Sequence, residues 1–156
     1  MTFLFFLVFL SACIVAGLPA NFFPTGEWYK NLTKPIWTPP DWIFPVVWFT
    51  LYCCMSYAAA RVSVGAEINL GLAFWALQIA LNTIWTPVFF GLHRIRLGLY
   101  VLIGLWLSVA ATMVCFFAVD IVAGFLFVPY LVWVSIAGAL NLAVLRLNPE
   151  QVRKAS

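Results

Sequence analysis

Residues 97–145 read LGLYVLIGLWLSVAATMVCFFAV, then Asp120, then IVAGFLFVPYLVWVSIAGALNLAVL. Asp120 is the one charged residue in this stretch. A helix that crosses the hydrocarbon core of a bilayer needs roughly 20 mostly apolar residues, because each residue advances about 1.5 Å along the axis. Each half of the stretch is therefore long enough to cross once, and Asp120 marks the turn between the two crossings.

The rest of the chain has the same character. Of its 156 residues, 65% are apolar and only 8% are charged, whereas a soluble domain carries about 25% charged residues. The sequence therefore predicts an all-α membrane protein, with one domain over residues 1–156 and five transmembrane helices in a compact bundle. Because the connections near 61–67, 93–96 and 120 are short, we expect sequential helices to be antiparallel neighbours. The predicted spans are 2–23, 42–61, 68–91, 97–119 and 122–146.

The first apolar segment has two interpretations. Thr2–Ala20 could be a secretory signal peptide, and Leu10–Cys13 resembles the site at which bacterial lipoproteins are cleaved and acylated. A signal peptide should begin with Lys or Arg, but no basic residue precedes Lys30, and the apolar run continues to Phe23. We therefore expect this segment to be retained as the first transmembrane helix.

The basic residues predict an orientation. With five crossings, one membrane face receives the first loop, the third loop and the C-terminus, and the opposite face has only Arg61. Short loops rich in Lys and Arg stay in the cytosol, so we expect the N-terminus outside and the C-terminus in the cytosol. The basic tail is also expected to contact anionic lipid headgroups. The seven basic residues of the predicted cytosolic face are Lys30, Lys34, Arg94, Arg96, Arg146, Arg153 and Lys154.

Residues that could perform catalysis or bind metal are sparse. The four cysteines lie inside apolar segments without paired spacing, and His93 is the one histidine. No nucleophile lies beside a base, and we expect no catalytic site, no metal site and no covalent cofactor. Nothing indicates a nucleic-acid partner. The five carboxylates all lie at span ends or in loops: Glu27, Asp41, Glu67, Asp120 and Glu150.

The first loop, 24–41, is unusually rich in proline and aromatic residues. Proline fixes φ and removes a backbone donor, so we do not expect this segment to be helical throughout. We interpret it as a lid across one mouth of the bundle. The alternative is an interfacial segment whose rings lie at headgroup level. The residues concerned are Pro24, Trp28, Tyr29, Pro35, Trp37, Pro39 and Pro40.

Three predicted spans carry polar and aromatic residues at helical spacing. Amides in hydrocarbon are costly unless they are hydrogen-bonded, so they should point into the bundle, either as interhelical hydrogen bonds or as part of a pocket. Trp106 and Trp133 lie near the centres of their spans, where a tryptophan needs a polar partner or a flat ligand. A pocket lined by several rings suits a large, planar, mostly apolar molecule. The residues sharing faces are Trp48 and Tyr52; Gln78, Asn82 and Trp85; and Tyr130, Trp133, Ala137, Leu140 and Asn141.

Several of these stretches together resemble the TspO/MBR family, which comprises bacterial tryptophan-rich sensory proteins and the mitochondrial translocator protein of animals. The resemblance covers nearly the whole chain in the right order. It is carried by KPIWTPPDW at 34–42, WFTLY at 48–52, Gln78-x-x-x-Asn82-x-x-Trp85, and Pro129-Tyr130-x-x-Trp133 with Leu140-Asn141.

The resemblance implies a commonly dimeric protein that binds porphyrins such as protoporphyrin IX, sterols and synthetic benzodiazepine-type ligands. It implies a pocket under the first loop, among the first, second, third and fifth spans. We expect a sensor, regulator or transporter of tetrapyrroles; the alternatives are a light- and oxygen-dependent porphyrin-degrading activity and a purely structural bundle. A homodimer could pack through the small residues Ala73, Ala76 and Ala80 of the third span. The expected ligand-binding residues are Trp37, Trp48, Tyr52, Asn82, Trp85, Trp133, Ala137 and Leu140.

Two departures from the family pattern are visible. Animal members have a tyrosine where this chain has Leu142, although Arg146 is retained, so we expect weaker cholesterol binding and a bacterial origin. Pro45 lies three residues before Trp48 rather than the usual two, so the pocket wall could be shaped differently.

Overall fold

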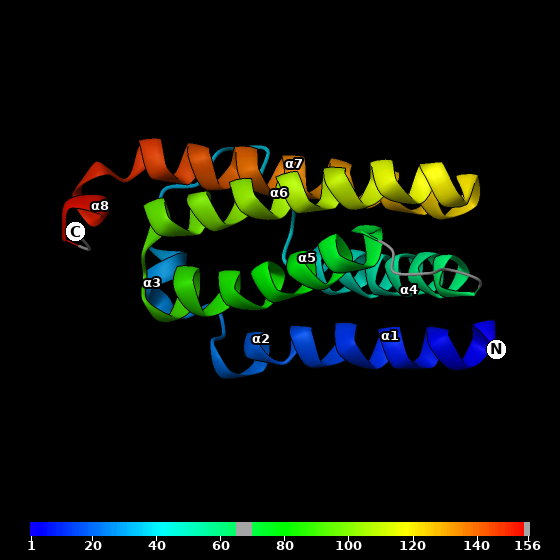
Figure 1. Cartoon of the computed structure of the whole chain (residues 1–156). Coiled ribbons are helices and arrows are strands. Elements are labelled where there is room, and N and C mark those ends of the chain that lie inside the picture. Colours follow the sequence, from blue (N-terminus) through cyan, green and yellow to red (C-terminus); the bar gives the residue numbers. More distant parts are fainter. Residues whose placement is uncertain (65–69, 155–156) are drawn as a thin grey trace.

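The computed structural model describes residues 1–64 and 70–154, and the described residues form a bundle of helices (Figure 1). Five helical stretches in this part of the chain are long and apolar enough to cross a membrane: 2–22, 43–63, 70–91, 95–119 and 121–147. The five-helix prediction is confirmed, with span ends within a few residues of those expected; positions 68 and 69 of the predicted third span lie outside the described residues. The elements are α1 (Thr2–Gly17), α2 (Pro19–Phe22), α3 (Glu27–Lys30), α4 (Ile43–Ser63), α5 (Leu70–Thr86), the π-helical turn η1 (Pro87–Gly91), α6 (Ile95–Val119), α7 (Ile121–Leu147) and α8 (Pro149–Lys154).

Local sequence explains where the spans bend and end. Pro19 divides the first span into α1 and α2, and Pro87 begins η1, since proline cannot donate a backbone hydrogen bond. Asp120 separates α6 from α7 and caps α7: its Oδ1 accepts hydrogen bonds from the amides of Val122 at 2.8 Å and Ala123 at 3.0 Å. Carboxylates are among the preferred N-terminal caps, so the turn predicted at Asp120 is built by that residue.

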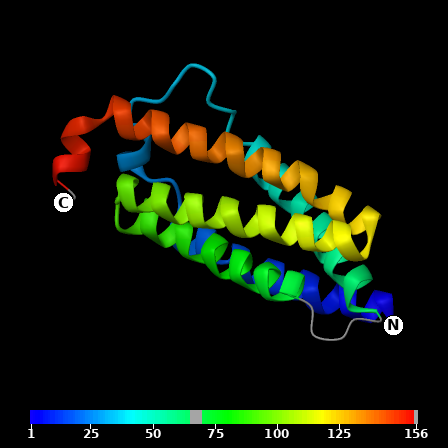
Figure 2. The same ribbon diagram turned by 45° about the horizontal axis from the view of Figure 1, so that its top comes forward.

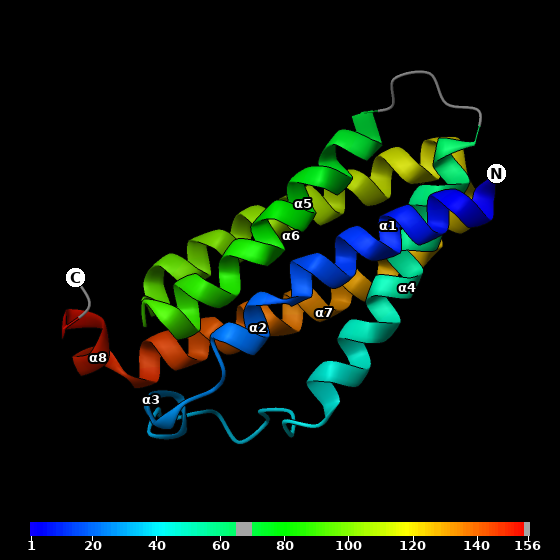
Figure 3. The same cartoon turned by 90° about the horizontal axis from the view of Figure 1, so that it is seen from below.

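The long helices are arranged in a ring with α6 packed extensively between α5 and α7, and α4 packed between α1 and α7 (Figures 1 and 3). Helix α1 also contacts α5, which closes the ring. The second and third spans, expected to be adjacent, do touch as α4 and α5, but only sparingly. A short connection fixes the ends of two helices but not the faces they present along their length. Space is therefore left between α4 and α5.

The core lies between α4, α6 and α7, where Met55, Phe116 and Phe127 are completely buried. The amides of the third span point inward as predicted: Gln78 is 0% exposed, and its Oε1 accepts a 2.8 Å hydrogen bond from the hydroxyl of Tyr130. Trp106 has the polar partner expected of a central tryptophan, because its Nε1 donates to Ser135 Oγ at 2.8 Å. The bundle interior is thus apolar with a few paired polar groups.

The small-residue face of α5 is exposed. Ala73, Ala76 and Ala80 are all exposed on this helix, beside the exposed Leu77 and Ile84. Small residues let helices approach closely, so a homodimer through this face stays a prediction.

An ion pair fastens the end of the bundle that holds the N-terminus. Arg61 of α4 donates from Nη2 and Nε to Asp120 Oδ2, at 2.7 Å and 2.9 Å. The hydrogen bonds from Arg61 are the main reason that the pKa of the Asp120 carboxyl is lowered below its ordinary value; desolvation opposes them, and the hydrogen bonds from the amides of α7 lower the pKa further.

The lowered pKa predicts an acid-dependent loss of stability. A carboxyl whose folded-state pKa is lowered contributes stability above its unfolded pKa of about 3.9, and loses it as the pH falls through that value to the folded-state pKa. Thermal unfolding in detergent should show a melting temperature that falls below about pH 4 in the wild type. The fall should be smaller in Asp120→Asn, which starts lower at pH 7 because the ion pair is absent. Equal pH dependence in both proteins would contradict this assignment.

Candidate ligand-binding cavity

A cavity of about 520 Å³ lies inside the half of the bundle that holds α3. Residues of α1, α4, α5 and α7 line it, together with the first loop and η1, and of the described residues in α6 none does. It is located where α4 and α5 diverge, which leaves a gap that neither helix fills. Its volume falls within the range of small-molecule sites, roughly 300–1,000 Å³.

Aromatic rings form most of the cavity wall. Trp48 and Tyr52 of α4 have ring centroids 5.6 Å apart, and Trp85 of α5 is stacked on Phe89 of η1 with centroids 5.0 Å apart. Phe90 follows on the same turn and meets Trp85 edge-on. Because these rings come from two different helices and the turn η1, a flat apolar molecule in the cavity would meet aromatic surface from more than one element.

Two polar side chains in this wall are left unsatisfied by the described residues. The indole Nε1 of Trp85 and both side-chain polar atoms of Asn141 are buried, and none of these atoms has a hydrogen-bond partner among the described residues. Asn141 is 3% exposed. Buried polar groups are almost always paired, so the Asn141 amide offers a donor and an acceptor to a bound molecule. Trp85 Nε1 instead lies beside Gly98 of α6, which does not line the cavity. A second amide, Asn82, donates to the hydroxyl of Tyr52 over a long 3.5 Å.

Charge is nearly absent from the cavity. Among the described residues that line it, Asp41 at the end of the first loop is the one charged residue. Burial raises the pKa of the Tyr29 phenol at the same mouth, and the nearby Asp41 carboxylate raises it further. Tyr29 is therefore a neutral hydrogen-bond donor at physiological pH. The chemistry of the cavity is apolar contact with a few neutral hydrogen bonds.

Six of the eight residues expected at the pocket line the cavity: Trp48, Tyr52, Asn82, Trp85, Ala137 and Leu140. Trp37 and Trp133 are not among the lining residues. Trp37 is 49% exposed, beside the fully exposed Ile36, because this part of the loop projects away from the bundle. Trp133 is buried one layer behind the wall, with its ring packed edge-on against Phe44 at 5.5 Å. Helical spacing put Trp133 on the correct side of α7 but not at the surface of the cavity.

Residues that sequence reasoning missed complete the wall. Gly17 of α1 lies against Tyr52, where a Cβ atom would come within 3.1 Å of the tyrosine hydroxyl, so glycine permits this close approach. Phe89 and Phe90 reach the cavity from η1, and Phe44 reaches it from the first turn of α4. Pro87 is the signal that could have indicated an irregular turn, since proline disrupts a continuing α-helix.

The first loop covers the cavity and is fastened to the end of α7. Pro24, Thr25 and Tyr29 of the loop line the cavity, as does Phe23 just before it, and Figures 2 and 3 show the segment between α3 and α4 looping from the end of α7 to the start of α4. Asn148, just after α7, accepts a hydrogen bond from the amide of Thr33 and donates one to the carbonyl of Thr33, both at 2.9 Å. We call this pair of hydrogen bonds the Asn148 clamp.

Two further contacts hold the lid in place. The side chain of Leu32 is buried against Phe89, Ile95 and Val144. Trp28 is stacked on His93 with ring centroids 4.2 Å apart. The lid is therefore held to the rest of the bundle by three sets of contacts.

Comparisons with known proteins agree with this architecture. The TspO/MBR family is matched over residues 5–147. The chain is 57% identical to Protein CrtK of Rhodobacter capsulatus over 148 residues, which cover 92% of each chain. It is 50% identical to the tryptophan-rich sensory protein of Cereibacter sphaeroides, over 92% of this chain and 90% of the relative. It is 38% identical to the translocator protein of Homo sapiens, over 78% of this chain and 75% of the relative. The chain is therefore a multi-pass integral membrane protein that belongs to the TspO/MBR family.

Proposed function

We propose that this protein binds a flat, mostly apolar ligand inside the bundle, with porphyrins such as protoporphyrin IX as the first candidates and sterols as the second. By binding them it senses, regulates or moves tetrapyrroles. The observation that carries the proposal is the cavity between α4 and α5, which is walled by Trp48 and Tyr52 on one side and Trp85 and Phe89 on the other.

The chemistry of the wall favours a macrocycle over a small polar metabolite. Aromatic pairs prefer offset-stacked or edge-to-face arrangements, and two ring-bearing walls can sandwich one planar molecule. The unpaired Asn141 amide can bond to ring or carbonyl heteroatoms. Because no Lys or Arg is among the described lining residues, the carboxylates of a porphyrin should point out of the mouth into water. The binding free energy then comes from contacts between the macrocycle and the aromatic wall of the cavity.

A tryptophan-quenching titration tests this proposal. The purified full chain should show saturable quenching by protoporphyrin IX. Trp48→Ala should weaken the affinity about tenfold, because the substitution removes roughly 1–2 kcal/mol of ring contact. Trp106→Phe is the matched control: Trp106 lies on α6, away from the cavity, and is bonded to Ser135. Affinity unchanged by Trp48→Ala, or equally reduced by both substitutions, would contradict the site.

A second titration separates the ligand classes. If porphyrins are the preferred class, a sterol should displace protoporphyrin IX only at a much higher concentration than unlabelled porphyrin does. Displacement by the sterol at equal concentration would instead make sterols the preferred class. If neither the porphyrin nor the sterol binds saturably, the proposed function of the cavity is wrong.

A further inference from the structure

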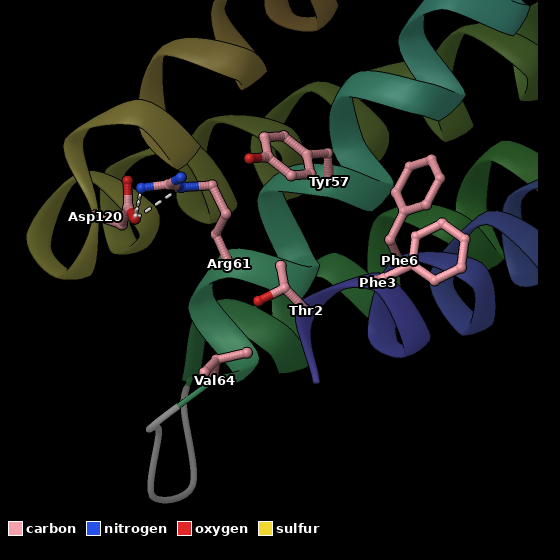
Figure 4. Close-up of a pocket in the computed structure, with 7 residues that line it drawn as sticks. All are labelled: Thr2, Phe3, Phe6, Tyr57, Arg61, Val64 and Asp120. Carbon is pink, nitrogen blue, oxygen red and sulfur yellow. Dashed lines mark hydrogen bonds and ion pairs between the residues drawn. The ribbon is translucent and has the colours of Figure 1, made fainter.

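A second hollow lies at the opposite end of the bundle, far from the lid. It is an open groove of about 720 Å³ between the start of α1 and the end of α4, and the turn before α7 contributes Asp120 (Figure 4). Its polar groups are Thr2, Arg61 and Asp120, and its rings are those of Phe3, Phe6 and Tyr57. We refer to this hollow as the interfacial groove. It shares no lining residue with the cavity.

The polarity of the interfacial groove changes with depth along the helices. Thr2 is the first residue of α1, and Arg61 lies in the last turn of α4, so both are at the level of one membrane surface. Phe6 and Tyr57 each lie one helical turn further into the span, about 6 Å deeper, with ring centroids 6.4 Å apart. A charged end at the surface and an aromatic wall beneath it match the headgroup and glycerol region of a lipid.

Arg61 retains capacity to bind an anion. A guanidinium has five N–H donors, and the Nε and Nη2 hydrogen bonds to Asp120 use two of them. The arginine side chain is still 33% exposed. Arg61 is also the single Lys or Arg expected on this membrane face, so it is the natural partner there for a phosphate group.

The carboxylate of Asp120, beside Arg61, narrows the class of lipid headgroup that the groove can bind. Because Arg61 and Asp120 carry opposite charges within 2.7 Å, the groove has no net charge from this pair, and a purely anionic headgroup gains little attraction. A headgroup with both a phosphate and an ammonium suits the pair better, with its phosphate on Arg61 and its ammonium toward Asp120. We propose that the interfacial groove binds a zwitterionic phospholipid headgroup of the phosphatidylethanolamine type.

Native mass spectrometry of the full chain in detergent tests this proposal, with phosphatidylethanolamine and phosphatidylglycerol of identical acyl chains titrated separately. The wild type should retain phosphatidylethanolamine more tightly. Arg61→Gln should weaken that binding about tenfold, as expected for loss of a hydrogen bond to a charged group. Arg96→Gln, which removes the same charge at the other end of the bundle, should leave it unchanged.

Asp120→Asn separates lipid recognition from damage to the fold. It breaks the same ion pair as Arg61→Gln, but it leaves the positive charge of Arg61 without a neighbouring carboxylate. We therefore expect the protein to bind phosphatidylglycerol more tightly than phosphatidylethanolamine. If both variants instead lose both lipids, the effect comes from the broken ion pair and the proposal is wrong. Tighter wild-type binding of phosphatidylglycerol, or equal losses in Arg61→Gln and Arg96→Gln, would also overturn it. Porphyrin binding should be unchanged in all these variants, so the outcome is independent of the cavity.

Discussion

Replacing Asn148 with alanine is expected to loosen the lid and accelerate ligand exchange about thirtyfold. The clamp consists of two 2.9 Å hydrogen bonds between the Asn148 side chain and the backbone of Thr33, 115 residues away in the sequence. The same amide also donates to the carbonyl of Val144 at 2.8 Å. Losing the pair costs roughly 2 kcal/mol, which is about thirtyfold in the equilibrium between closed and open lid.

Two measurements distinguish a clamp from a passive contact. In the ligand-free protein, the Thr33 amide should exchange its hydrogen faster in Asn148→Ala. In stopped-flow quenching with protoporphyrin IX, the association and dissociation rates should rise together, while the affinity changes much less. The reason is that opening of the lid allows the ligand both to enter and to leave the cavity. Asn31→Ala, an exposed substitution in the same loop, is the control and should change neither.

The hydrogen-exchange and ligand-kinetics measurements can also give different outcomes, and each outcome tests a separate part of the prediction. Faster exchange at Thr33 without faster ligand kinetics would show that the lid does not control access to the cavity. Unchanged exchange at Thr33 would show that the clamp does not hold the lid. Neither result depends on whether porphyrin is the natural ligand.

Replacing Gln78 with leucine is expected to destabilise the bundle by about 2 kcal/mol. The Tyr130 hydroxyl is completely buried and donates to Gln78 Oε1 at 2.8 Å. Interhelical hydrogen bonds in membranes average only about 0.6 kcal/mol, but a buried donor left without its partner carries a desolvation cost of about 1–3 kcal/mol. The desolvation cost is the larger effect here, since the hydroxyl lies in the core and cannot reach water.

A double-mutant cycle tests that reasoning. If the cost comes from the unpaired hydroxyl, Tyr130→Phe combined with Gln78→Leu should recover most of the lost free energy of unfolding. Thr83→Val is a matched control, because Thr83 Oγ1 bonds only within its own helix, to the carbonyl of Ile79, and it should cost less than about 0.5 kcal/mol. A wild-type melting curve for Gln78→Leu would show that the pair is not a stability element.

The spans could be predicted from sequence because hydropathy is a local property. Asp120 could likewise be recognised as a turn, since one long apolar run ends just before it and another begins just after it. Helical spacing also indicated which side of α5 faces inward, and Gln78 and Asn82 are buried there as expected. Each of these inferences needs only residues that are close in the chain.

Which of the expected residues line the cavity depends on information about neighbouring helices. Spacing placed Trp133 on the inner side of α7, but only the position of Phe44 decides that its ring lies behind the wall. The loop motif singled out Trp37, but the burial of Leu32, not of Trp37, anchors the loop. The contact of Asn148 with Thr33 joins residues at opposite ends of the chain, and no local pattern indicates it. The predicted orientation in the membrane stays a prediction.

The exclusion of α6 from the cavity has a practical consequence for experiments. Its outer surface carries exposed residues such as Ile103 and Leu107, while its inner surface supports α5 and α7. A spin label or fluorophore attached at Ile103 would therefore sit on a scaffold that ligand does not touch. Paired with a second label on the first loop, it would provide a fixed reference point against which movement of the loop could be recorded.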